Sequence, residues 1–279
     1  MRWRPRRGGG DIEDRRGAGM GSGGLGIPLP VGGGIGGLIV LALIVLLSTG
    51  VLGGGGTSPA PPSGGADTTS REYQFVKFIA GDVQDQWEQA FREDARPYER
   101  TKLVLFENGT QTGCGTASSQ TGPFYCPVDR KVYLDLGFLR ELKSRFGAPG
   151  DFAQAYVIAH EFGHHVQNLT GIMDDVQKEQ QSHPDEANEL SIRLELQADC
   201  LAGVWGHSAA QQDLLDPGDL EEGLQAASAV GDDRIQKEST GRVNPESWTH
   251  GSSEQRVKWF RRGFDSGDTQ ACNTFKGSI

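Results

Sequence analysis

The sequence predicts a mainly helical α+β domain with a small β-sheet, preceded by a single transmembrane helix. Through most of the chain after residue 70, apolar residues recur at helical spacing, and only a few short runs have the pattern of strands. Nearer the N-terminus, residues 35–52 contain no charged side chain. A membrane-spanning helix needs roughly 17–25 apolar residues, so this stretch is long enough to qualify.

Charge is distributed unevenly along the 279 residues, which carry a formal net charge of −10. Residues 1–34 hold six Arg and three acidic residues. An Arg excess before an apolar helix predicts a cytoplasmic N-terminus, with everything after the helix outside the cytoplasm of a bacterial cell. The acidic balance of the whole chain excludes a nucleic-acid partner, because such binding needs a basic surface.

The composition divides the chain into four parts. We expect residues 1–34 to be a disordered Arg/Gly-rich cytoplasmic segment and residues 35–52 to anchor the chain in the cell membrane. Residues 53–70 are rich in Gly, Pro and Ser and predict a linker. The folded domain then covers residues 71–279. A cleaved signal peptide is the main alternative to the anchor, but 34 residues are too many for its basic N-terminal region.

The first part of the folded domain alternates between a long helix and short strands. Residues 72–95 carry apolar side chains at helical spacing and end before Pro97. Residues 102–106 form an apolar run typical of a buried strand. Residues 124–126 and 131–136 are separated by a short Pro-containing turn, which predicts a β-hairpin.

The rest of the domain is predicted to be helical. A short helix over residues 138–146 ends at a glycine, and a long helix follows over residues 151–169. The next helix begins near Pro184 and continues to Trp205, because Pro is favoured at the first helical position. A further helix is expected over residues 220–236.

The helix over residues 151–169 carries two histidines four positions apart, His160 and His164. Four residues correspond to about one turn, so both imidazoles lie on one face and can reach one Zn²⁺ at about 2.0–2.1 Å. Glu161 is rotated by roughly 100° and can act on a water at the metal as a general base. A chance pattern on a solvated helix is the alternative, but the chain contains only six His.

The next helix supplies the remaining acidic groups of this site. Glu195 and Asp199 are again four positions apart and share one face. A catalytic zinc takes three protein ligands and keeps a fourth position for water, so we assign Glu195 as the third ligand of one Zn²⁺ per chain. Asp199 is expected to accept the second ring N–H of a ligand histidine. A solvated acidic face is the alternative interpretation.

His250 precedes an apolar helix near the C-terminus. A histidine brought close to the zinc can hold the oxygen that gains negative charge during hydrolysis, and we include His250 as a candidate catalytic residue. A capping or purely structural role stays open. The adjacent acids Asp232 and Asp233 are interpreted as a solvated helix end.

The four cysteines are sufficient for two disulfides, which persist outside the cytoplasm. Pairing Cys114 with Cys126 would close a Gly/Ser/Thr-rich loop, and pairing Cys200 with Cys272 would hold the C-terminal tail against the helix that carries Glu195. Mass spectrometry of unreduced peptides tests this hypothesis.

Five motifs together resemble the bacterial neutral zinc metallopeptidases of the YpfJ-like type: GPFYCP (122–127), HEFGHH (160–165), ELQADC (195–200), AGVWGH (202–207) and THGSSEQR (249–256). The resemblance implies a zincin-like metallopeptidase fold for residues 71–279. A wider similarity is to the membrane-associated Glu-zincins, in which a Glu on a later helix is the third ligand. In that group a Pro follows the histidine that corresponds to His250, whereas this chain has Gly251.

These observations predict a membrane-anchored zinc endopeptidase that hydrolyses polypeptide substrates with zinc-activated water and Glu161 as the base. Two other functions are compatible with the residues. The domain could bind zinc and serve as an envelope adaptor or chaperone-like module without turnover. It could also be a zinc amidase that acts on cell-wall peptides.

Overall fold

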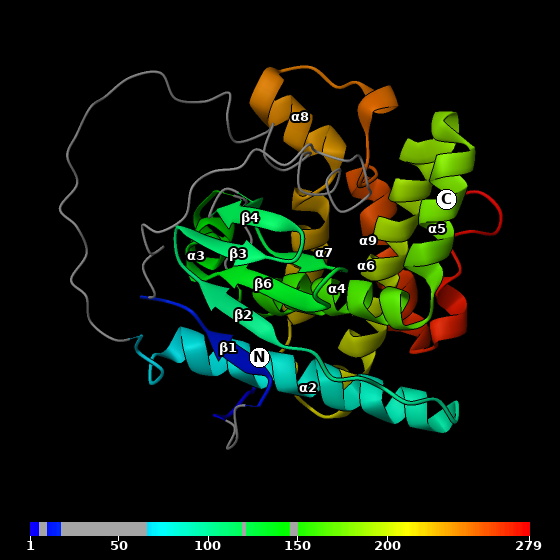
Figure 1. The fold of residues 1–279 in the computed structure, drawn as a ribbon. Coiled ribbons are helices and arrows are strands. Elements are labelled where there is room, and N and C mark those ends of the chain that lie inside the picture. The colour runs from blue at the N-terminus through cyan, green and yellow to red at the C-terminus, as the bar shows by residue number, and fades with distance from the viewer. Residues whose placement is uncertain (6–9, 18–65, 119–120, 146–149) are drawn as a thin grey trace, which may run out of the picture.

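Helices make up most of the computed structural model, which describes residues 1–5, 10–17, 66–118, 121–145 and 150–279 (Figure 1). The strands are β1 (Ile12–Asp14), β2 (Leu103–Phe106), β3 (Gly109–Thr112), β4 (Gly115–Ser118), β5 (Phe124–Cys126) and β6 (Lys131–Asp135). The α-helices are α2 (Arg71–Glu93), α3 (Leu136–Arg145), α4 (Asp151–Leu169), α5 (Ile172–Ser182), α6 (Ala187–Gln211), α7 (Asp219–Ala229), α8 (Asp232–Thr240) and α9 (Ser253–Ser266). The α+β class is as predicted.

The long helices lie close to where their apolar periodicity places them. The chain enters α2 after Ser70, whose hydroxyl accepts a hydrogen bond from the Tyr73 amide and so satisfies one of the free N–H groups at the helix start. The helix expected near Pro184 begins at Ala187, because Pro184–Glu186 forms a 3₁₀ turn. The expected helix over residues 220–236 is instead two helices, α7 and α8. A side chain at Gly231, between them, would meet the Ser253 backbone at 2.3 Å.

The main sheet has the strand order β1-β2-β6-β5. The predicted hairpin is correct: β5 pairs antiparallel with β6, and Tyr125 lies opposite Val132. The two other pairs are parallel, with β2 beside β6 and β1 beside β2. Strands β3 and β4 form a separate antiparallel hairpin that the sequence analysis did not predict. Figure 1 shows α2 running along the side of the main sheet that holds β1. Helices α5 and α6 lie on the side of α4 that faces away from this sheet.

The N-terminal segment corrects the predicted organisation. Residues 1–34 were expected to be disordered, yet β1 pairs with β2, and the Trp3 ring packs edge-on against Phe75 at 5.4 Å between centroids. Ion pairs reinforce this docking, among them Lys131 with Glu13 at 2.7 Å. Residues 10–17 therefore belong to the same sheet as the strands of the domain.

The transmembrane helix in the predicted fold class is also corrected. Among the helices that the structure describes, none combines the length and the apolar character needed to span a bilayer. The predicted anchor, residues 35–52, and the predicted linker up to residue 65 lie outside the described residues. The described fold is therefore a mainly helical α+β domain with a small sheet, and the structure does not support the predicted transmembrane helix.

Close packing of α6 against α9 forms the centre of the helical half. A side chain at Gly203 would meet the Phe260 carbonyl oxygen at 2.1 Å, and one at Gly263 would meet the Cys200 carbonyl oxygen at 1.9 Å. Each helix thus needs a glycine where its partner's backbone approaches. This contact fixes the position of α6, which carries half of the candidate site.

Candidate functional site

The three predicted metal ligands lie together between α4 and α6. Their ligand atoms, one each from His160, His164 and Glu195, are all within 4.8 Å of one another. The Nε2 atom of His160 is 3.2 Å from one Glu195 oxygen, and the Nε2 atom of His164 is 3.4 Å from the other. All three side chains are buried. Nitrogen and carboxylate donors in this number are the set that Zn²⁺ uses in catalytic sites.

A glycine inside the histidine motif brings the two helices together. A side chain at Gly163 would lie 3.1 Å from the carbonyl oxygen of Ala198, tighter than an ordinary contact. The small residue therefore permits α4 and α6 to approach where Glu195 must reach the two histidines. The motif thus supplies the spacing between the helices as well as two of the candidate ligands.

The outer nitrogen of each ligand histidine has its own partner. The Nδ1 atom of His160 lies 2.9 Å from a carboxylate oxygen of Asp199, as the sequence analysis expected of Asp199. The Nδ1 atom of His164 lies 2.8 Å from the side-chain oxygen of Gln167. With Nδ1–H donating outward, each Nε2 atom keeps its lone pair for a cation. The donor set and its orientation therefore fit a divalent metal ion.

Asp199 is the centre of a buried hydrogen-bond network whose members are distant from one another in the sequence. Its carboxylate accepts hydrogen bonds from Arg256, through Nε at 2.8 Å and a terminal nitrogen at 2.9 Å, and from the Tyr156 hydroxyl at 2.5 Å. Burial alone would raise the pKa of Asp199, but Arg256 and His160 outweigh it and lower that pKa. Arg256 thus lies on the Nδ1 side of His160 and neutralises the charge of Asp199, the acid that orients this histidine.

For His160 and Glu195, burial and the neighbouring charged groups act on the pKa in opposite directions. Burial opposes charge on His160, yet Asp199 and Glu195 raise its pKa to about 10. Burial likewise opposes charge on Glu195, yet His164 and His160 hold its pKa well below the usual range. The acids and histidines thus stabilise each other's charged forms. A metal ion binds the neutral imidazole, so a cation held by these side chains would replace the proton of His160.

Glu161 follows the first ligand on α4 and is also buried, with 8% of its surface exposed. Burial raises the pKa of its carboxyl, while the neighbouring histidines act in the opposite direction. A carboxyl whose pKa is raised toward neutrality is suited to accept and return a proton during hydrolysis.

His250 is held by Asp232, which the sequence analysis had placed at a solvated helix end. One Asp232 oxygen is 3.1 Å from His250 Nδ1, and the other accepts hydrogen bonds from the Thr249, His250 and Gly251 amides. Burial lowers the pKa of His250, but Asp232 and the charge of Glu195 outweigh it and raise that pKa. The charge of Glu195 reaches His250, so the histidine lies within electrostatic range of this candidate ligand.

The remaining histidine of the motif has a structural role. His165 is fully buried, and its two ring nitrogens lie 3.0 Å from the Tyr125 hydroxyl and 2.7 Å from the Glu99 carbonyl oxygen. Both nitrogens are therefore used in joining α4 to β5 and to the loop before β2.

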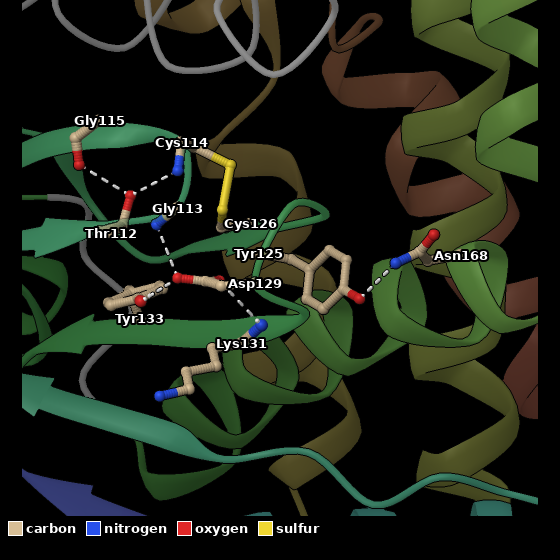
Figure 2. The surroundings of a disulfide bond; sticks show 10 residues. All are labelled: Thr112, Gly113, Cys114, Gly115, Tyr125, Cys126, Asp129, Lys131, Tyr133 and Asn168. Atoms are coloured by element: carbon tan, nitrogen blue, oxygen red, sulfur yellow. Dashed lines mark hydrogen bonds between the residues drawn. A yellow bond between two sulfur atoms is a disulfide. The ribbon is translucent and has the colours of Figure 1, made fainter.

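Both predicted disulfides are present. Cys114 joins Cys126, with 5.8 Å between Cα atoms, and Cys200 joins Cys272, with 5.5 Å. Figure 2 shows the first bond closing the turn between β3 and β4 onto β5, beside Asp129, which accepts a hydrogen bond from the Gly113 amide at 2.7 Å. The second bond attaches the C-terminal tail to α6.

Several site residues were missed because their partners are distant in sequence. Tyr156 is one turn before His160, and Gln167 is three residues after His164, so their helical spacing was the available signal. Asp232 had no comparable signal, because the hydrogen bonds of its side chain go to a loop 17–19 residues away.

The comparisons with known proteins agree with this geometry. A family model described as "Putative neutral zinc metallopeptidase" matches residues 1–275. The chain belongs to this family. It is 50% identical over 291 aligned residues, covering all of both chains, to the Escherichia coli K12 protein named "Uncharacterized protein YpfJ". It is also 48% identical over 192 residues to a Mycobacterium tuberculosis H37Rv protein named "Uncharacterized protein Rv2575", covering 65% of this chain and 64% of that protein. No solved structure matches.

Proposed function

We propose that the protein is a zinc-dependent endopeptidase whose domain works outside the cytoplasm. The convergence of His160, His164 and Glu195, with Glu161 beside them, is the observation that carries this proposal. Membership in a family of zinc metallopeptidases supports a zinc peptidase in general. The two disulfides favour an oxidising compartment, since cytosolic thiols are kept reduced.

The two histidines and Glu195 would hold the metal ion, which when bound supplies Lewis-acid activation of water and of the substrate carbonyl. Asp199 keeps the His160 ring in the tautomer that presents Nε2, and Arg256 keeps Asp199 ionised. Both effects are in place before any substrate arrives, so the site is preorganised.

Proton transfer is assigned to Glu161. Its carboxylate takes a proton from the attacking water and returns it to the leaving nitrogen of the peptide. His250, oriented by Asp232, donates a hydrogen bond to the substrate oxygen that becomes negatively charged.

The sheet suggests where a peptide would bind. Strand β6 lies between β2 and β5 and therefore has no free edge. Among the described strands, β1 and β5 are the two edges of the main sheet, and β5 packs against α4. An extended peptide would therefore add beside Phe124–Cys126 through backbone hydrogen bonds.

The test compares the full-length protein with its Glu161→Gln variant. We expect both to bind one zinc per chain, and we expect only the wild type to cleave an unstructured protein such as casein. Equal cleavage by the variant would refute the base assignment. A zinc-bound wild type that cleaves no polypeptide would favour an adaptor role, and cleavage restricted to cell-wall peptides would favour an amidase.

A further inference from the structure

The two ligand histidines are oriented by different kinds of group. His160 has the Asp199 carboxylate, which forms a buried ion pair with Arg256. His164 has the neutral amide of Gln167, which is fully buried. A carboxylate can only accept a hydrogen bond, but an amide can either donate or accept, so something must fix which end of Gln167 faces the histidine.

The surroundings of the Gln167 amide fix its orientation. Its Nε2 group donates to the Leu194 carbonyl oxygen at 2.7 Å and to the Gln197 side-chain oxygen at 3.1 Å. A reversed amide would place its oxygen against these two acceptors, leaving all three without a proton to share. Gln167 must therefore present its oxygen to His164, which must then carry its proton on Nδ1 and leave Nε2 free for the metal.

Gln197 is fixed in turn by the C-terminal tail. Its Nε2 group donates to the Cys272 carbonyl oxygen at 3.1 Å, so its own oxygen is directed at Gln167. Cys272 is the last residue of the 3₁₀ turn η4 (Thr269–Cys272) and is bonded to Cys200 of α6. The disulfide thus holds in place the carbonyl group at the end of this chain of hydrogen bonds.

The tail is attached to one face of α6 at three positions. Beyond Cys272, the Thr274 hydroxyl donates to the Arg193 carbonyl oxygen at 2.6 Å, and the Arg193 side chain donates to the Thr274 and Gly277 carbonyl oxygens. Arg193, Gln197 and Cys200 are spaced by four and three residues, which places them on the same side of the helix. The tail therefore runs along α6 past the level of Glu195.

We propose that Gln167 and Gln197 are positioning residues of the metal centre, through which the disulfide-attached C-terminal tail holds His164 in its metal-binding orientation. This inference rests on the proposed zinc site. It assigns a function to a buried pair of glutamines and to a disulfide that otherwise only restrains the tail. Loss of a hydrogen-bond partner of a ligand histidine typically weakens metal binding by about 10–100-fold.

The experiment measures zinc dissociation constants of full-length variants by competition with a chromophoric chelator. We expect Gln167→Leu to weaken zinc binding by about 10–100-fold and to shift the visible absorption of the Co²⁺-substituted protein. Gln197 is hydrogen-bonded to Gln167 and reaches His164 only through it, so Gln197→Leu should weaken zinc binding less than Gln167→Leu does. Adding Gln197→Leu to Gln167→Leu should weaken binding no further, because both changes break the same chain of contacts.

Gln180→Leu is the matched control. Gln180 is also a buried glutamine. Its Nε2 group donates hydrogen bonds to two residues in the first turns of α6, the carbonyl oxygen of Ala187 and the hydroxyl of Ser191. These hydrogen bonds do not go to a candidate ligand, so this variant should lose unfolding stability without any change in zinc affinity. A Cys200→Ser/Cys272→Ser variant should weaken zinc binding, and Gln197→Leu should add little to it.

The outcomes separate this inference from the proposed function. A wild type that binds no zinc refutes the proposed function itself. A wild type that binds zinc tightly, with Gln167→Leu equal to Gln180→Leu in affinity, refutes the positioning role alone. If Gln167→Leu does not fold, unchanged affinity in Gln197→Leu is sufficient to overturn it.

Discussion

Replacing Arg256 by Met should greatly reduce the stability of the domain even without metal. Arg256 is 4% exposed and donates two hydrogen bonds, at 2.8 and 2.9 Å, to Asp199, which is fully buried. It donates a third to the Val230 carbonyl oxygen at 3.1 Å. Removing one partner of a buried ion pair leaves an uncompensated charge and costs about 3–5 kcal/mol. We therefore expect the free energy of unfolding to fall by about that amount.

Urea denaturation followed by circular dichroism, with chelator present throughout, measures this loss without a contribution from metal binding. The matched control is Arg261→Met, the same change at an exposed position of the same helix, which should alter stability by no more than about 0.5 kcal/mol. Combining Arg256→Met with Asp199→Asn should cost less than the sum of the two single changes, since the orphaned charge is then removed. A loss below about 1 kcal/mol for Arg256→Met would refute the structural assignment and favour a substrate-facing guanidinium.

Four further outcomes are expected. Gly203→Ala should lower stability by about 1–3 kcal/mol, because its side chain would meet the Phe260 carbonyl oxygen at 2.1 Å; an unchanged melting temperature would contradict the close packing of α6 and α9. Replacing Cys114 and Cys126 by Ser should cost about 3 kcal/mol in chemical denaturation, from the released loop entropy. His250→Ala should lower kcat by about 10²–10³-fold with zinc content unchanged, and a normal kcat would remove it from the mechanism. Zinc at about 100 times its dissociation constant should raise the free energy of unfolding by about 2.7 kcal/mol over the chelated protein.

Helical periodicity explains why much of the candidate site was predictable. His160 and His164 lie one turn apart on α4, and Glu195 and Asp199 lie one turn apart on α6. Each pair depends only on local helix geometry, which the apolar pattern already indicated. Pairing α4 with α6 then required only that a zinc site needs a third ligand.

The N-terminal segment was not predictable in the same way. Its Gly- and Arg-rich composition is typical of disorder, and β1 has only three residues. The strand exists because β2 offers an edge to it, and Leu103 lies opposite Ile12 from 91 positions away in the chain. Composition carries no information about a partner at that distance, so it could not predict that residues 12–14 form a strand of the sheet.

By itself, the sequence indicated the α+β class of the fold, the long helices that carry the candidate ligands, those candidate residues and the cysteine pairing that the structure contains. Only the tertiary structure decided what surrounds them: Arg256 behind Asp199, Asp232 beside His250, and the two glutamines that join His164 to the tail. The physical reason is the distance along the chain between the residues that interact. A helix presents its own residues at fixed intervals, whereas the partner of a buried polar group is chosen by packing between segments that no local pattern brings together.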